Sequence, residues 1–95
     1  MDRQRTVIRE PDFEDHLAVI VKEFPRAGQF VEGAEWVLSR DPLFGFQVAL
    51  ESPVWFLPIQ EVTTIPPIHV YYTFDDDHVW LLEIRVDRLV WDSLR

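Results

Sequence analysis

The sequence predicts an α+β domain: an N-terminal strand, a helical hairpin, then an antiparallel β-meander packed on the helices. Apolar residues recur with a helical period up to residue 38, and strand-like alternation replaces that period after residue 53. Clusters of Pro, Gly and Asp separate the segments. The 95 residues can enclose one hydrophobic core, so we predict a single domain over residues 1–95.

The first strand and the first helix follow from the opening 25 residues. Residues 5–9 form a short β-prone run that Glu10-Pro11 closes. Asp12 is expected to cap a helix that carries one apolar stripe over residues 13–24. Pro25 ends this helix, because the residue before a proline avoids the helical region.

The middle of the chain is expected to complete the hairpin and return to the sheet. A second helix follows Gly28 and stops at residues 39–42, and the short link predicts an antiparallel pair of helices. Phe44 and Phe46 come next and are expected to fill the space between the helices and the sheet. Residues 54–59 then read as a strand at an edge or a bulge, since they include a proline.

Residues 68–74 and 79–86 give the clearest strand signals, and the three aspartates between them predict a β-hairpin. Side chains alternate across a strand, so each arm has two rows. We expect the bulkier row of each arm to face the helices: Ile68, Val70, Tyr72 and Phe74, with Trp80, Leu82, Ile84 and Val86.

The opposite face of this hairpin holds the candidate site, formed by His69, Tyr71, Glu83 and Arg85. A three-residue turn would pair His69 with Glu83 and Tyr71 with Leu81. A longer turn would pair His69 with Arg85 and Tyr71 with Glu83. In both registers the four residues gather at one end of the open face.

These four side chains could support acid–base chemistry on an anionic substrate. Histidine is the residue type most often used to transfer protons, so His69 could take or give a proton, and Glu83 could orient it. Arg85 could bind a phosphate or carboxylate through two hydrogen bonds, and Tyr71 could stack on a base or donate its hydroxyl proton. The alternative is that they are cross-strand polar pairs on a solvated sheet face.

The composition indicates no cofactor and no metal site. The chain has no cysteine, which excludes a disulfide framework, a thiolate zinc site and a cysteine nucleophile. His16 and His78 have no second ligand at metal spacing, and the loop at residues 75–77 is too short to supply the oxygens that calcium prefers.

The charge and the ends of the sequence bear on partners and location. Seventeen Asp and Glu against nine Lys and Arg give a net charge of −8, which argues against nucleic acid or an anionic membrane as a general partner. We find no signal peptide and no membrane-spanning apolar run, so we expect a cytoplasmic protein.

Three aromatic residues bear on self-association. Trp36, Phe56 and Trp91 are either covered within the fold or form a patch that a second chain would bury. The second case predicts a homodimer.

The element order resembles that of the RelE/ParE superfamily of bacterial toxins. The resemblance depends on the end of the second helix, Leu38-Ser-Arg-Asp41-Pro42-Leu43-Phe44-Gly45, and on the last hairpin, Ile68 to Ile84. In that family the second helix commonly closes on a Leu…Asp-Pro step, and a strand similar to Arg-Val-x-Tyr leads through an acidic turn to Val-x-(Leu/Ile)-Leu. The resemblance spans residues 5–86.

The resemblance implies a toxin of a toxin–antitoxin module, bound by a cognate antitoxin. Family members are ribosome-dependent messenger RNA endonucleases or gyrase poisons, and both are usually basic. The endonucleases use the open sheet face for cleavage, and here His69, Tyr71 and Arg85 match that face, with Glu83 as neighbour. This sequence has His69 where an Arg is common, Ala49-Leu-Glu51-Ser-Pro53 where Gly-x-Arg is common, and 8 acids against 3 bases after residue 49. We therefore expect RNA cleavage and ribosome binding to be weakened or lost.

Two other functions remain open. The chain could be a non-catalytic interaction module that oligomerises through its exposed aromatic surface. It could also be a small enzyme unrelated to RNA that uses His69 and Glu83 as an acid–base pair.

Overall fold

The computed structural model describes residues 4–59 and 66–87 and confirms an α+β fold of two helices and a five-stranded mixed sheet. The elements are β1 (Thr6–Arg9), α1 (Pro11–Glu23), α2 (Ala27–Arg40), a short 3-10 turn (Pro42–Phe44), β2 (Phe46–Gln47), β3 (Trp55–Ile59), β4 (Ile68–Phe74) and β5 (His78–Val86). The strand order is β1-β5-β4-β3-β2, with β1 parallel to β5 and the other neighbours antiparallel.

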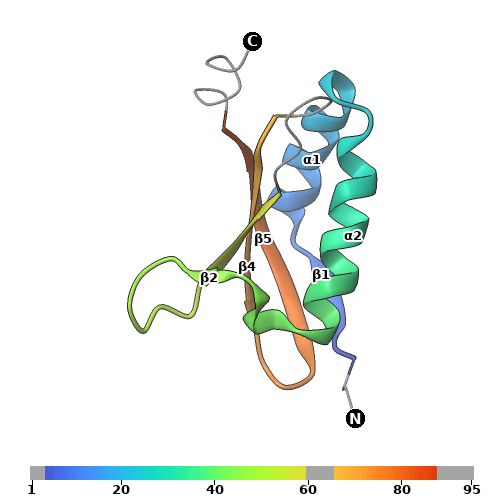
Figure 1. The fold of residues 1–95 in the computed structure, drawn as a ribbon. Coiled ribbons are helices and arrows are strands. Elements are labelled where there is room, and N and C mark those ends of the chain that lie inside the picture. Colours follow the sequence, from blue (N-terminus) through green and yellow to red (C-terminus); the bar gives the residue numbers. More distant parts are fainter. Residues whose placement is uncertain (1–3, 60–65, 88–95) are drawn as a thin grey trace.

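The two helices lie side by side on one face of the sheet, and the loop between β2 and β3 projects away from them (Figure 1). The core lies between the helices and the sheet. It is formed by the fully or almost fully buried side chains Phe13, Leu17, Ile20, Ala27, Val31, Ala34, Leu38, Leu57, Ile68, Val70, Tyr72, Val79, Leu81 and Ile84. Within the described residues no helix covers the opposite face, which we call the open face.

The helices match their predicted positions except at the start of α1. The expected cap, Asp12, lies in the first turn, because the helix begins at Pro11 and Glu10 occupies the cap position. The fixed φ of proline suits the first helical position, which needs no N–H donor. The helix ends at Glu23, just before Phe24-Pro25, as predicted. No helix in the described ranges is long and apolar enough to cross a membrane.

The segment after α2 differs most from the sequence prediction. Phe44 and Phe46 do not fill the space between helices and sheet: they are 60% and 58% exposed. A buried hydroxyl holds this segment instead. Tyr72 donates to the carbonyl oxygen of Pro42 at 2.5 Å and accepts from the N–H of Gly45 at 3.2 Å. This clamp positions residues 46–47 to pair with β3 as the short edge strand β2.

The hairpin of β4 and β5 turns more tightly than expected. The N–H of Asp75 donates to the carbonyl oxygen of His78 at 3.0 Å, so only Asp76 and Asp77 lie in the turn. The carboxylate of Asp75 accepts from the N–H groups of Asp77 and His78, at 2.8 and 2.7 Å. These hydrogen bonds hold the pKa of Asp75 below its usual value. The acidic turn is therefore explained by turn geometry.

A β-bulge in β5 sets the register at the other end of the hairpin. Tyr72 pairs with Leu81 but Tyr71 pairs with Glu83, so Leu82 is the extra residue. The sequence predicted the pairing of His69 with Arg85 only for a longer turn. The turn is short, and the bulge produces this pairing instead.

The structure also differs from the prediction in which side chains of β5 face the helices. Trp80 and Leu82 were expected to face the helices, but Val79 and Leu81 are buried there instead, and Ile84 follows them on the same face. Trp80 pairs with Thr73 on the open face.

Candidate functional site

The structure brings the four predicted site residues to neighbouring positions on the open face. His69 lies opposite Arg85 and Tyr71 lies opposite Glu83, on adjacent strands β4 and β5. The rings of His69 and Tyr71 are 6.4 Å apart between centroids. A shallow hollow of about 300 Å³ opens beside them, lined by Val54, Tyr71, Leu82, Glu83 and Arg85.

Aromatic side chains extend this face toward the edge of the sheet. Phe56 on β3 lies 5.7 Å from the His69 ring and 6.2 Å from the Tyr71 ring. Phe46 on β2 continues the row at 5.7 Å from Phe56. The site is therefore one end of a largely aromatic surface, which favours stacking or apolar contact over proton transfer.

Glu83 is not placed to orient His69. Its carboxylate forms a short contact with Nδ1 of His16 on α1, and it accepts from the N–H of Ile84 at 2.9 Å. β1 ends at Arg9, opposite Leu81, so this part of β5 borders α1 instead of another strand. From the sequence, His16 was considered only as a metal ligand and its contact with Glu83 was missed, because a lone histidine on the polar face of a helix carries no motif.

The His16–Glu83 pair makes stability depend on pH. The hydrogen bond and the charge of Glu83 raise the pKa of His16. Burial raises the pKa of Glu83, but hydrogen bonds from His16 and from the N–H of Ile84 outweigh burial and leave this pKa lowered. The stabilisation from His16 is lost as pH rises through its raised pKa, and that from Glu83 is lost as pH falls through its lowered pKa.

We therefore expect the pair to stabilise the fold most between the usual pKa values of Glu and His, about 4.3 and 6.5. His16→Ala should reduce the gain in stability that the wild type shows on acidification from pH 8 to 6. Urea unfolding across this range measures the effect, and an NMR titration of the His16 ring checks its pKa. A His16 pKa at or below the ordinary value would contradict the pair.

Positive charge is scarce on the sheet. Arg85 is the only lysine or arginine in β2–β5. Arg9 on β1 forms two hydrogen bonds with Glu35 of α2, at 2.9 and 2.7 Å, which tie the first strand to the second helix. A single exposed arginine is a weak basis for binding an RNA backbone, whose affinity depends on several cations.

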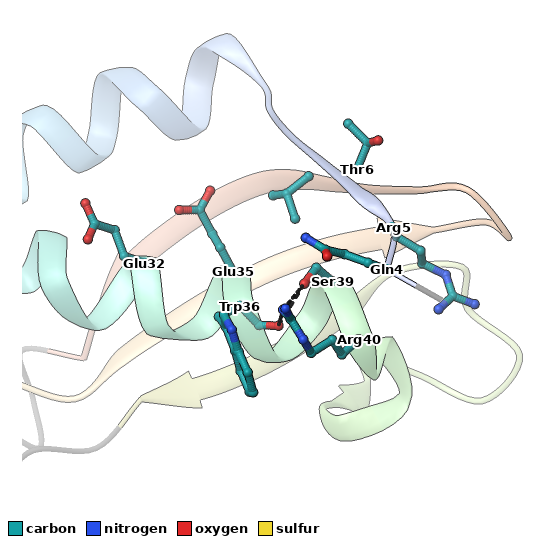
Figure 2. A pocket seen from close by; sticks show the side chains of 9 residues that line it. Gln4, Arg5, Thr6, Glu32, Glu35, Trp36, Ser39 and Arg40 are labelled. Atoms are coloured by element: carbon teal, nitrogen blue, oxygen red, sulfur yellow. Dashed lines mark hydrogen bonds between the residues drawn. The ribbon is translucent and has the colours of Figure 1, made fainter. Parts of the chain in front are cut away.

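A larger hollow, of about 710 Å³, lies between β1 and α2. Figure 2 shows Glu32, Glu35, Trp36, Ser39 and Arg40 along one wall and residues 4–6 along the other. Its two arginines already donate to main-chain carbonyls: Arg40 to Trp36 and Arg5 to Asp75. Glu32 and Glu35 also line the hollow, and their negative charge makes it unsuited to an anion.

Among the described residues, five of the seven exposed large apolar side chains belong to one stretch, residues 43–50, which we call the apolar segment. Leu43, Phe44, Phe46, Val48 and Leu50 are each at least 50% exposed, and Leu50 reaches 91%. No residue of the segment is charged. Of the three aromatics whose exposure the sequence left open, Trp36 is exposed and stacks under Arg40, and Phe56 is half-buried in the open face. Trp91 lies outside the described residues.

Comparison with protein-family models, curated proteins and solved structures finds no match. Among the described residues, no group of three or more His, Cys, Asp or Glu is arranged to hold a metal ion. The function therefore has to be inferred from the residues of the open face and the apolar segment.

Proposed function

We propose that this chain is a protein-binding domain with a RelE/ParE-like fold, in which partner binding has replaced RNA cleavage as the main activity. The observation that carries the proposal is the apolar segment. Five large apolar side chains are exposed over eight consecutive uncharged residues of a protein with net charge −8. Exposed apolar surface of this extent is typical of a site that another protein covers.

The open face supports the same proposal. Phe46 belongs both to the apolar segment and to the aromatic row with Phe56, so the two surfaces are continuous. Glu83 is held by His16 and cannot act on His69 from that position. Arg85, the one cation of β2–β5, also lies beside Glu83, whose charge offsets its attraction for phosphate.

Affinity capture with a tagged chain tests the proposal. Phe46→Glu should abolish binding of the partner, because it places a charge in the centre of the apolar surface. Val19→Glu is the matched control: Val19 is 64% exposed but lies on α1. The proposal fails if the bound proteins are the same for the wild type and for both variants.

RNA cleavage is the second candidate function, favoured by one observation: His69, Tyr71 and Arg85 share the open face as the resemblance to the toxin family implies. If the chain is an active toxin, its expression should arrest growth and degrade messenger RNA, and His69→Ala or Arg85→Ala should relieve both effects. Each substitution should lower cleavage by roughly 10²–10⁴-fold if the residue acts in proton transfer or charge stabilisation. Normal growth with intact messenger RNA would exclude an active nuclease.

A further inference from the structure

Among the described residues, no strand pairs with the outer backbone edge of β2. The N–H of Val48 donates to the carbonyl oxygen of Val54 on β3, at 3.0 Å. Backbone groups alternate in direction along a strand, so the N–H and C=O of Phe46 also point toward β3. The N–H and C=O of Gln47 point away from β3. Proteins usually protect such an edge with charges, with proline or by keeping the edge strand short. The apolar segment has no charge and no proline, and the two-residue length of β2 limits the pairing to a short stretch.

The apolar side chains of this segment are arranged symmetrically about Gln47. Phe46 and Val48 are its immediate neighbours, and Phe44 and Leu50 lie three residues away on either side. If two such strands run antiparallel with Gln47 opposite Gln47, Phe46 of each copy faces Val48 of the other. Phe44 lies in the 3-10 turn before β2 and Leu50 in the turn after it, so these two side chains flank the paired residues. The pattern is self-complementary, which is the requirement for a two-fold interface.

We propose that the partner of this surface is a second copy of the chain, paired antiparallel along β2 about a two-fold axis at Gln47. The inference rests on the proposed function, because it names the protein that covers the apolar segment. The Gln47 residues of the two copies would exchange N–H···O=C hydrogen bonds, and the sheet would continue across both copies. An axis perpendicular to the sheet places both open faces on the same side.

The size and charge of the surface fit such a dimer. A large aromatic side chain buries roughly 150–250 Å², so Phe44 and Phe46 together offer on the order of 200 Å² at their observed exposure. Three aliphatic side chains and the strand edge add to this, which gives an interface at the small, weaker end of the usual range. Two copies of charge −8 repel each other, and an uncharged contact segment adds no repulsion of its own. Added salt should therefore strengthen the dimer by screening.

Sedimentation equilibrium of the purified full chain tests the inference. The wild type should change from monomer to dimer with rising concentration, and Phe46→Glu should weaken the dimer by at least about 10-fold. Val19→Glu adds the same charge outside the interface and should leave the dissociation constant within about 2-fold, since it loses no contact there. Circular dichroism checks that both variants are folded.

A cysteine at the axis tests the register. The chain has no cysteine, so Gln47→Cys introduces a single thiol. Directly opposed residues that exchange hydrogen bonds have Cα atoms about 5.5 Å apart, within disulfide range. Diamide should therefore convert this variant into a covalent dimer much faster than a Gln29→Cys variant, whose thiol would lie at an exposed position of α2, outside the proposed interface. Equal rates for the two variants would overturn the proposed pairing.

The outcomes separate this inference from the proposed function. A wild type that stays monomeric at millimolar concentration overturns the second-copy inference. The proposed function still stands in that case if Phe46→Glu abolishes capture of a different protein and Val19→Glu does not. If Phe46→Glu changes neither dimerisation nor capture, both proposals fail.

Discussion

Leu81→Ala should lower the free energy of unfolding by about 2–5 kcal/mol, whereas Leu82→Ala should cost less than about 1 kcal/mol. The two leucines are adjacent in the sequence, but Leu81 is 1% exposed and Leu82 lies at the bulge outside the core. Removing the Leu81 side chain leaves a cavity between the sheet and the helices. Removing the Leu82 side chain leaves none, because solvent already reaches that position.

Urea unfolding followed by tryptophan fluorescence measures both values. Ile84→Ala is the control on the other side of the bulge: it should resemble Leu81→Ala, because Ile84 is 2% exposed. In a regular strand without the bulge, Leu81 and Ile84 would lie on opposite faces of the sheet, so only one of them could be buried in the core. Equal losses for Leu81→Ala and Leu82→Ala, or a small loss for Ile84→Ala, would contradict the register.

The same bulge shows where sequence reasoning reaches its limit. Helix positions and four of the strands follow from apolar period and from proline, both of which act locally. The sequence does not show which side chains of β5 face the helices, because residues 79–82 are all apolar and fit either alternation. Which row of β5 side chains is buried depends on the pairing of Leu81 with Tyr72 and on the extra residue, Leu82. Neither can be predicted from the sequence of β5 alone.

The candidate site divides in a similar way. His69 and Tyr71 could be placed on one face because the side chains of β4 alternate regularly. Arg85 shares that face only because of the bulge, since regular alternation from buried Val79 and Leu81 would turn it toward the helices. The contact of Glu83 with His16 could not be predicted from the sequence, because it depends on where α1 lies against the end of β5. β2 was also missed, since two residues give no periodic signal and only the contacts of Tyr72 and β3 hold them in place.

Tyr72→Phe should destabilise the fold by about 1–3 kcal/mol, because it leaves two buried main-chain groups without a partner. The hydroxyl is the donor to Pro42 and the acceptor for Gly45, and the Tyr72 side chain is fully buried. Burial raises the pKa of Tyr72 to about 12, so the clamp stays neutral and intact up to strongly alkaline pH. Denaturant unfolding measures the loss. Tyr71→Phe, which removes a hydroxyl from the open face, is the matched control and should cost less.

Gly45→Ala should act on the same clamp and cost roughly 1–3 kcal/mol through overpacking. A Cβ atom at this position would lie 2.5 Å from the Tyr72 hydroxyl and 2.5 Å from the carbonyl oxygen of Phe56, so the chain has to shift. Tyr72→Phe removes only the first of these clashes. The double variant should therefore lose less stability than the sum of the single variants. Fully additive losses of stability would show that the Tyr72 hydroxyl and Gly45 act independently. That result would contradict the clamp. If the clamp holds β2 in place, either variant should also weaken dimerisation through the apolar segment, although Tyr72 lies outside that segment and Gly45 is a buried residue within it.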